Sequence, residues 1–156
     1  MNEVIDSEIV IIGAGVIGCA TAYHLTKMGK TSVTIIEKNQ VTHGSTWHAA
    51  GLVGQLRASR NTTRMLQKSI ALYDELERET GQVVDWKQVG SLRVASSRER
   101  LLEIKRLATS AKSYGLEMHL LSAQEAQEVF PLLSTKGFHV AGFLPSDGFV
   151  DPSSLT

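Results

Sequence analysis

A glycine-rich turn at residues 13–18, which reads GAGVIG, constrains the fold of this chain more than any other feature. A β-branched run over residues 8–12 precedes the turn, and a helical pattern over residues 19–28 follows it. A second β-branched run, residues 33–36, ends at Glu37. A dinucleotide-binding fingerprint requires this context: a strand, a glycine turn, a helix, a second strand and an acidic residue within about 30 residues. The pattern predicts a Rossmann-like unit and therefore an α/β fold.

The three glycines of the turn have separate tasks in such a unit. Gly13 permits the tight turn, Gly15 removes a side chain where a pyrophosphate must approach the backbone, and Gly18 lets the helix pack closely on the strand. The anion would lie at the helix N-terminus. Glu37 would accept hydrogen bonds from the adenosine ribose, and its charge disfavours the 2′-phosphate of NADP. The alternative is a glycine turn in a parallel-sheet protein that binds no nucleotide.

The fingerprint does not separate FAD from NAD, because both present an adenosine pyrophosphate to the same strand, turn and helix. The next loop, residues 44–52, reads GSTWHAAGL. Its small residues let the backbone approach a flat ligand closely, and the neutral imidazole of His48 is a nucleophile as well as a hydrogen-bonding group. This combination favours a flavin, with His48 beside it.

The chain resembles the dimethylglycine and sarcosine dehydrogenase family, within the glycine-oxidase-like FAD-dependent oxidoreductases. The resemblance begins with residues 10–18, Glu37-Lys38 and GSTWHAAGL. It continues through residues 76–81, 90–92 and 130–132, and through Asp147-Gly148 with Asp151-Pro152, so it covers essentially the whole sequence. It implies an FAD-dependent amine dehydrogenase that oxidises an N-methylated glycine, dimethylglycine or sarcosine, by hydride transfer to the flavin.

In that family FAD is commonly held covalently through a histidine in the loop after the second strand, and His48 occupies the matching position. The rival is His43, which precedes Gly44. A loop histidine that never touches the flavin is a further alternative, and we assign Trp47 no separate role. The cofactor contacts that the resemblance implies are Gly13, Gly15, Val16, Ile17, Gly18, Glu37, Lys38, Gly44, Ser45, Thr46, Trp47, His48, Ala49, Ala50, Gly51 and Leu52.

The resemblance also implies partners beyond the cofactor. These are a small methylated amine, an electron acceptor such as an electron-transfer flavoprotein, and tetrahydrofolate in a C-terminal domain outside this sequence. The expected location is the cytoplasm, or the mitochondrial matrix in a eukaryote. Two rival functions stay open: an oxidase that binds FAD without a covalent bond, and a regulatory relative that has lost the chemistry.

The composition of the chain argues against several other kinds of function. Sixteen basic residues balance sixteen acidic ones, so net charge favours neither nucleic acid nor an anionic membrane surface as a partner. The longest apolar run, residues 9–12, is too short to span a bilayer. The single Cys19 is expected to be an inert, buried thiol. His24, His119 and His139 lack metal-ligand spacing, so we expect no metal site.

The rest of the chain predicts alternating helices and strands. A core-facing helix is expected over residues 63–79, with Gly81 as its stop, and a helix that Ser97 caps is expected to run to about Tyr114. Its basic and acidic side chains are expected to form a solvated, ion-paired face. A capping box at residues 122–125 predicts a short helix that Pro131 ends. The expected strands are residues 83–86, 91–95, 116–121 and 138–144.

The domain organisation that we predict has three segments. Residues 1–82 belong to the FAD-binding domain, residues 83–145 start an α+β substrate domain with an antiparallel sheet, and residues 146–156 return toward the FAD domain. Asp151-Pro152 is a helix-start pattern that only four residues follow. We therefore expect a truncated chain, one that does not fold alone because its sheet lacks covering strands.

Overall fold

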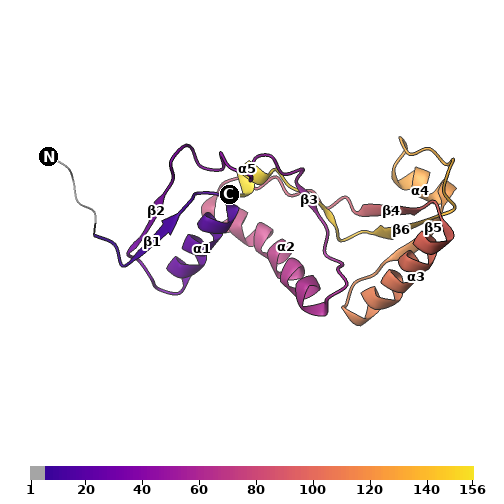
Figure 1. The fold of residues 1–156 in the computed structure, drawn as a ribbon, viewed down its shortest axis with the longest axis horizontal. Coiled ribbons are helices and arrows are strands. Elements are labelled where there is room, and N and C mark those ends of the chain that lie inside the picture. Colours follow the sequence, from indigo (N-terminus) through magenta and orange to yellow (C-terminus); the bar gives the residue numbers. More distant parts are fainter. Residues whose placement is uncertain (1–5) are drawn as a thin grey trace. The chain divides into compact units, whose positions relative to one another are not determined.

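The computed structural model describes residues 6–156 (Figure 1), which fall into two compact units. The first unit contains the described residues up to Gly51, together with Val83–Asp85 and Asp151–Thr156. The second contains Leu52–Gln82 and Trp86–Val150. The domain boundaries expected from the sequence, at residues 82 and 145, stay a prediction.

The first unit is built on a parallel strand pair with a helix between its strands. Strand β1 (Ile9–Ile12) pairs with β2 (Val33–Ile36) in a register that sets Ile9 opposite Val33. Helix α1 (Val16–Lys27) connects the two strands and packs on them. It begins three residues before the predicted start because Gly15 is already its extended N-cap. The predicted Rossmann-like unit is thereby confirmed.

The first unit also contains a loop and a short helix. Residues 41–48, between β2 and Gly51, form a continuous series of turns. Helix α5 (Pro152–Leu155) begins where Asp151 accepts a hydrogen bond from the Ser154 N–H at 2.7 Å, which confirms the predicted helix start.

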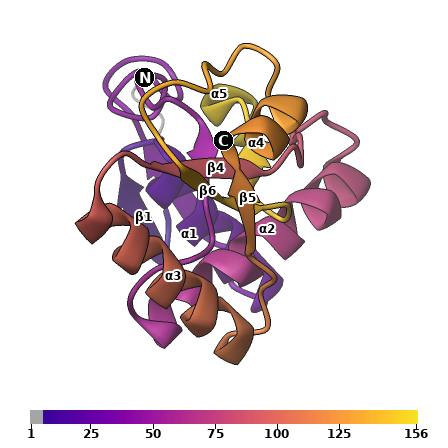
Figure 2. The same cartoon turned by 90° about the vertical axis from the view of Figure 1, so that its right-hand side faces the viewer.

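The core of the second unit is a three-stranded antiparallel sheet in the order β4-β6-β5. The strands are β4 (Ser91–Ala95), β5 (His119–Ser122) and β6 (Val140–Leu144). Helices α3 (Arg98–Ser113) and α4 (Ala123–Val129) pack on this sheet (Figure 2). Gly142 faces Ile104 and Met118 in the cluster beside α3, whereas its neighbour Ala141 belongs to the cluster beside α4. The sheet therefore separates two small apolar cores.

A buried carboxylate organises the remaining strand pair of the second unit, β3 (Leu52–Val53) with β7 (Gly148–Phe149). Asp147 has no exposed surface. Its two oxygens accept hydrogen bonds from the Gln55 N–H at 2.9 Å and the Ser91 hydroxyl at 2.6 Å. The segment after β3 is thus linked to the segment before β7 and to β4.

Helix α2 (Arg60–Thr80) differs from its prediction in burial. Ser59 caps its start, and Gly81 ends it in the left-handed conformation, with φ of 69°, as expected. Thr63 is its one buried residue, however, and Met65 is 68% exposed. Most of the expected apolar stripe is nevertheless half-buried, at Leu66, Ile70, Leu72, Tyr73 and Leu76, so the core-facing helix is present but its apolar face is only partly covered.

The prediction of a strand over residues 83–86 is also wrong. Asp85 has a positive φ of 57°, which interrupts an extended backbone, and strand-like pairing is confined to a bridge between Lys87 and Phe149. The predicted strands 116–121 and 138–144 are present in shorter or shifted form as β5 and β6.

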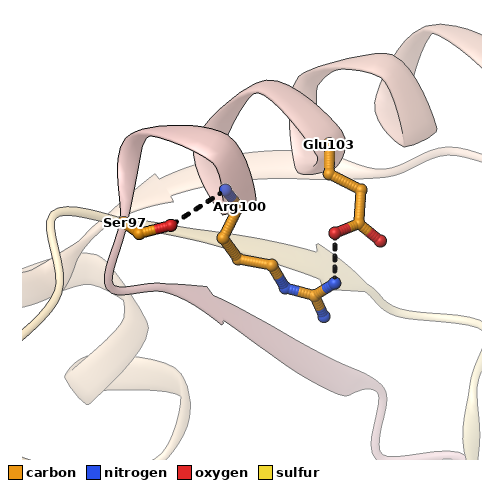
Figure 3. A network of polar contacts seen from close by, with 3 residues as sticks. All are labelled: Ser97, Arg100 and Glu103. Atoms are coloured by element: carbon orange, nitrogen blue, oxygen red, sulfur yellow. Dashed lines mark hydrogen bonds and ion pairs between the residues drawn. The ribbon is translucent and has the colours of Figure 1, made fainter.

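The start of α3 shows the predicted ion-paired face (Figure 3). The Ser97 hydroxyl accepts a hydrogen bond from the Arg100 N–H at 3.2 Å, and the Arg100 guanidinium lies 2.6 Å from the Glu103 carboxylate. Ser122 and Glu125 form the predicted capping box at α4.

Two further observations concern membrane-spanning helices and the single cysteine. Within residues 6–156, the structure contains no helix with the length and hydropathy that a bilayer crossing requires. Cys19 is partly rather than fully buried, and this burial raises the pKa of its thiol; its lack of reactivity stays a prediction.

Candidate cofactor site

The glycine turn of the first unit has a geometry that larger residues would disrupt. Gly13 has φ of 102°, and its N–H donates to the Ile36 carbonyl at 2.7 Å, so the turn lies against the end of β2. A Cβ at Gly18 would lie 2.0 Å from the Gly13 carbonyl oxygen, which no real structure tolerates. The close packing of helix on turn therefore requires glycine at position 18.

The N-terminus of α1 offers hydrogen-bond donors beside this turn. The Val16 N–H donates to Thr46 Oγ1 at 3.1 Å. Among the described residues, the N–H groups of Ile17 and Gly18 meet no acceptor. The Ile17 side chain is 81% exposed, so this helix end is open to a ligand. Free N–H groups at a helix N-terminus next to a glycine turn fit a pyrophosphate.

Glu37, at the end of β2, is held by the same turn. Its Oε2 accepts a hydrogen bond from the Ala14 N–H and its Oε1 accepts one from the Asn39 N–H, both at 2.9 Å. These two bonds, that of Ala14 first, lower the pKa of the carboxyl below its ordinary value. Each oxygen retains a lone pair, so the ionised group can still accept bonds from ribose hydroxyls. The neighbouring Lys38 is exposed.

The loop that carries His48 is held against the turn at two points. Thr46 is 8% exposed, and its hydroxyl oxygen is the acceptor for Val16 described above. The Thr42 N–H donates to the Ala14 carbonyl at 2.9 Å. The sequence analysis placed both segments in one site and named Thr46 as a cofactor contact, but it did not predict that the Thr46 side chain joins the two segments.

The imidazole of His48 is oriented by its own loop. Its Nδ1 lies 3.0 Å from the Gly44 carbonyl oxygen. A carbonyl oxygen only accepts, so Nδ1 carries the hydrogen in this bond, and the lone pair of the neutral ring is on Nε2. The side chain is exposed, so Nε2 is accessible to a ligand.

Trp47 has a role that the sequence reasoning did not give it. Its ring centroid lies 4.0 Å from that of His48, with 41° between the planes, and its indole N–H donates to the His43 carbonyl at 3.0 Å. The tryptophan thus supports the imidazole on one side. The rival, His43, is exposed and contributes its backbone carbonyl to this arrangement.

The structure brings most of the predicted site residues together in the first unit. Ser45, Ala49 and Ala50 are exposed in the loop, and Gly51 has a positive φ of 69°. Leu52 is the exception, because it belongs to the second unit, where it pairs with Phe149.

A parallel strand pair, a glycine turn, an open helix N-terminus and an acidic residue after the second strand define a dinucleotide-binding protein of the Rossmann type. The comparison with protein families identifies the family of dinucleotide-binding proteins to which the chain belongs. The chain belongs to the FAD dependent oxidoreductase (DAO) family, whose sequence model matches residues 8–156.

Individual relatives agree with this assignment. Human dimethylglycine dehydrogenase is 43% identical over 96% of this chain and 17% of its own length, and human sarcosine dehydrogenase is 40% identical over 94% and 16%. The mouse pyruvate dehydrogenase phosphatase regulatory subunit is 31% identical over 96% and 17%. The crystal structure of L-proline dehydrogenase from P. horikoshii superposes with a TM-score of 0.87 at 32% identity, over 96% of this chain and 39% of that one. The chain thus spans less than a fifth of these mammalian relatives.

Proposed function

We propose that the protein to which this chain belongs is an FAD-dependent amine dehydrogenase that oxidises an N-methylated glycine, dimethylglycine or sarcosine. Two observations support the proposal. The dimethylglycine and sarcosine dehydrogenases match the chain at 40–43% identity. The accessible Nε2 of His48 lies in a loop held against the glycine turn, where a flavin ring would follow the pyrophosphate.

The residues of the first unit have distinct tasks toward FAD. The N–H groups of Ile17 and Gly18 would hold the pyrophosphate, and Glu37 would accept from the ribose. The small residues of the loop would allow close approach of the backbone to the flavin. FAD, when bound, would supply a two-electron oxidant for the removal of a hydride from the N-methyl carbon of the substrate.

The single observation that supports covalent attachment most strongly is the bond from His48 Nδ1 to the Gly44 carbonyl. It fixes the tautomer that leaves Nε2 unprotonated, which is the form that attacks an electrophilic carbon. Attachment would join Nε2 to the flavin 8α carbon with the loss of two protons, one from that carbon and one from Nδ1, and the two electrons would pass to dioxygen or another acceptor. A histidyl substituent would retain the cofactor and make it a stronger oxidant.

The same proposal includes the fate of the products. The oxidised amine, an iminium, would be hydrolysed to formaldehyde, or its carbon would be captured by tetrahydrofolate in a C-terminal domain. Electrons would pass to an acceptor such as an electron-transfer flavoprotein. The human relatives are named as mitochondrial proteins, which supports a matrix location in a eukaryote and a cytoplasmic one otherwise.

Two other functions compete with this one. One is an oxidase with FAD bound non-covalently. The other is a regulatory protein without catalysis, which the 31% identity to a regulatory subunit favours. His48 argues against the regulator, because an imidazole with an accessible Nε2 in this loop would have no task there.

One experiment separates the three functions. The full-length protein is purified, denatured and run on a gel, and flavin fluorescence is sought on the polypeptide, with His48→Asn as the control. Fluorescence on the wild type but not on the variant supports the dehydrogenase. Flavin that separates from the polypeptide supports the oxidase, and no flavin at all supports the regulator.

A further inference from the structure

We propose that Thr46 is a positioning residue that fixes the His48 loop against the glycine turn, and that its hydroxyl thereby controls how fast His48 becomes attached to the flavin. The part about attachment rests on the proposed function. The observation behind it is the hydrogen bond from the Val16 N–H to Thr46 Oγ1, which joins residues 30 positions apart in the sequence.

Burial distinguishes Thr46 from the rest of the loop. It is 8% exposed, whereas its neighbours Ser45, Trp47 and His48 are all exposed. A buried β-branched side chain with few rotamers holds its oxygen in one place. That oxygen accepts from the first N–H of α1, a group that has no acceptor within the helix itself.

Gly15 provides the room for this contact. A Cβ at position 15 would lie 3.0 Å from Thr46 Oγ1, which is tighter than ordinary van der Waals contact. The sequence reasoning explained Gly15 by the approach of a pyrophosphate. The structure adds a second reason, which is the approach of the Thr46 side chain from the His48 loop.

The other hydrogen bonds of the His48 loop do not join a side chain of the loop to the glycine turn. The Trp47 N–H to Thr42 carbonyl bond (3.4 Å) and the Ala49 N–H to Thr46 carbonyl bond (3.1 Å) both lie inside the loop. The Thr42 N–H to Ala14 carbonyl bond does reach the turn, but it is made by backbone atoms. Thr46 is therefore the side chain through which substitution can loosen the loop from the turn.

The test compares Thr46→Val with Thr46→Ser in the full-length protein produced without flavin. Valine keeps the shape and removes the acceptor, whereas serine keeps the acceptor. Thr42→Val is the matched control, because it makes the same chemical change in the same loop, leaves the backbone contact of Thr42 with the turn in place, and removes only the long 3.5 Å contact of its hydroxyl with Ser153 Oγ. Three quantities are measured: hydrogen exchange of the Val16 amide, the dissociation constant of FAD before attachment, and the rate of covalent attachment after FAD is added.

We expect Thr46→Val to speed Val16 exchange and to slow attachment, each by about fivefold to tenfold, the equivalent of one lost hydrogen bond. Thr46→Ser and Thr42→Val should stay within about twofold of the wild type. The FAD dissociation constant should change less than the attachment rate, since Ile17 and Gly18 keep their free N–H groups. If Thr46→Val does not fold, Thr46→Ala replaces it with the same expected direction.

The two proposals fail in different ways. If Thr46→Val exchanges Val16 and attaches flavin at wild-type rates, Thr46 does not position the loop. If the wild type never attaches flavin, the proposed tether is wrong, and Thr46 is then judged by Val16 exchange alone, where unchanged exchange in Thr46→Val overturns its role.

Discussion

Glu37 and Ala14 are joined by a hydrogen bond of 2.9 Å between the Oε2 of the glutamate and the alanine N–H, across 23 positions of sequence. The acidic residue that would bind a ribose thus also stabilises the turn that would bind the pyrophosphate. The two halves of a dinucleotide site are coupled before any ligand arrives, and this coupling has a pH dependence.

The pKa of Glu37 is lowered by the Ala14 and Asn39 N–H groups, from an ordinary value of 4.5. A lowered pKa in the folded state means that the ionised carboxylate stabilises the fold fully above pH 4.5, and that this contribution is lost as the pH falls through the lowered value. Glu37→Gln should therefore melt at a lower temperature than the wild type near neutral pH, and the difference should shrink below pH 4.5. Thermal unfolding of the full-length protein, from about pH 7 to about pH 3, measures it. A difference independent of pH would contradict the account.

Gly18→Ala should destabilise the first unit. Its Cβ would overlap the Gly13 carbonyl oxygen at 2.0 Å, and backbone has little freedom to move, so we expect a cost of about 1–3 kcal/mol or more. Gly44→Ala is the matched control, because its Cβ would meet nothing within 4 Å. Chemical denaturation of both variants measures the cost. Equal stability of the two would show that the close contact at Gly18 is not real.

Asp147→Ala should destabilise the second unit. The substitution leaves the buried Gln55 N–H and the Ser91 hydroxyl without their acceptor, and each unsatisfied donor costs about 1–3 kcal/mol. We expect a total loss of about 2–4 kcal/mol, with a smaller loss for Ser91→Ala, which removes one of the two bonds. Urea unfolding monitored by tryptophan fluorescence measures both. A loss in Asp147→Ala no larger than that in Ser91→Ala would contradict a role for both oxygens.

At the start of α3, the cap should matter more than the ion pair. Ser97→Ala removes the acceptor for the Arg100 N–H and should cost about 1 kcal/mol. Arg100→Gln breaks the pair with Glu103, but both side chains are exposed, at 41% and 55%, so the cost should stay below about 0.5 kcal/mol. The unfolding free energies of the two variants show which stability loss is larger. A larger loss in Arg100→Gln than in Ser97→Ala would contradict the prediction.

The sequence predicted the elements whose pattern is local. The βαβ unit, the Ser97 cap, the capping box at Ser122 and the stop at Gly81 all follow from short-range rules of backbone and hydrogen bonding. The same holds for the glycine turn. These features depend on residues a few positions apart, and such short-range patterns can be recognised in a single sequence.

The sequence did not predict features that depend on contacts far apart in the chain. The bond between Thr46 and Val16 and the stacking of Trp47 on His48 require a known path for the loop. The strand expected at residues 83–86 failed because Asp85 adopts a positive φ that its sequence neighbours do not announce. The apolar face of α2 is only partly buried, which the sequence did not predict because periodicity identifies an apolar face but not how far it is covered.

The most direct test of the central claim is a peptide map of the full-length, flavin-loaded protein. After digestion, the peptide that contains His48 is examined by mass spectrometry for the added mass of one FAD less two hydrogens, and its fragmentation locates the modified residue. The account predicts the addition on His48, with His43 unmodified. A fully flavin-loaded protein in which His48 is unmodified would contradict it.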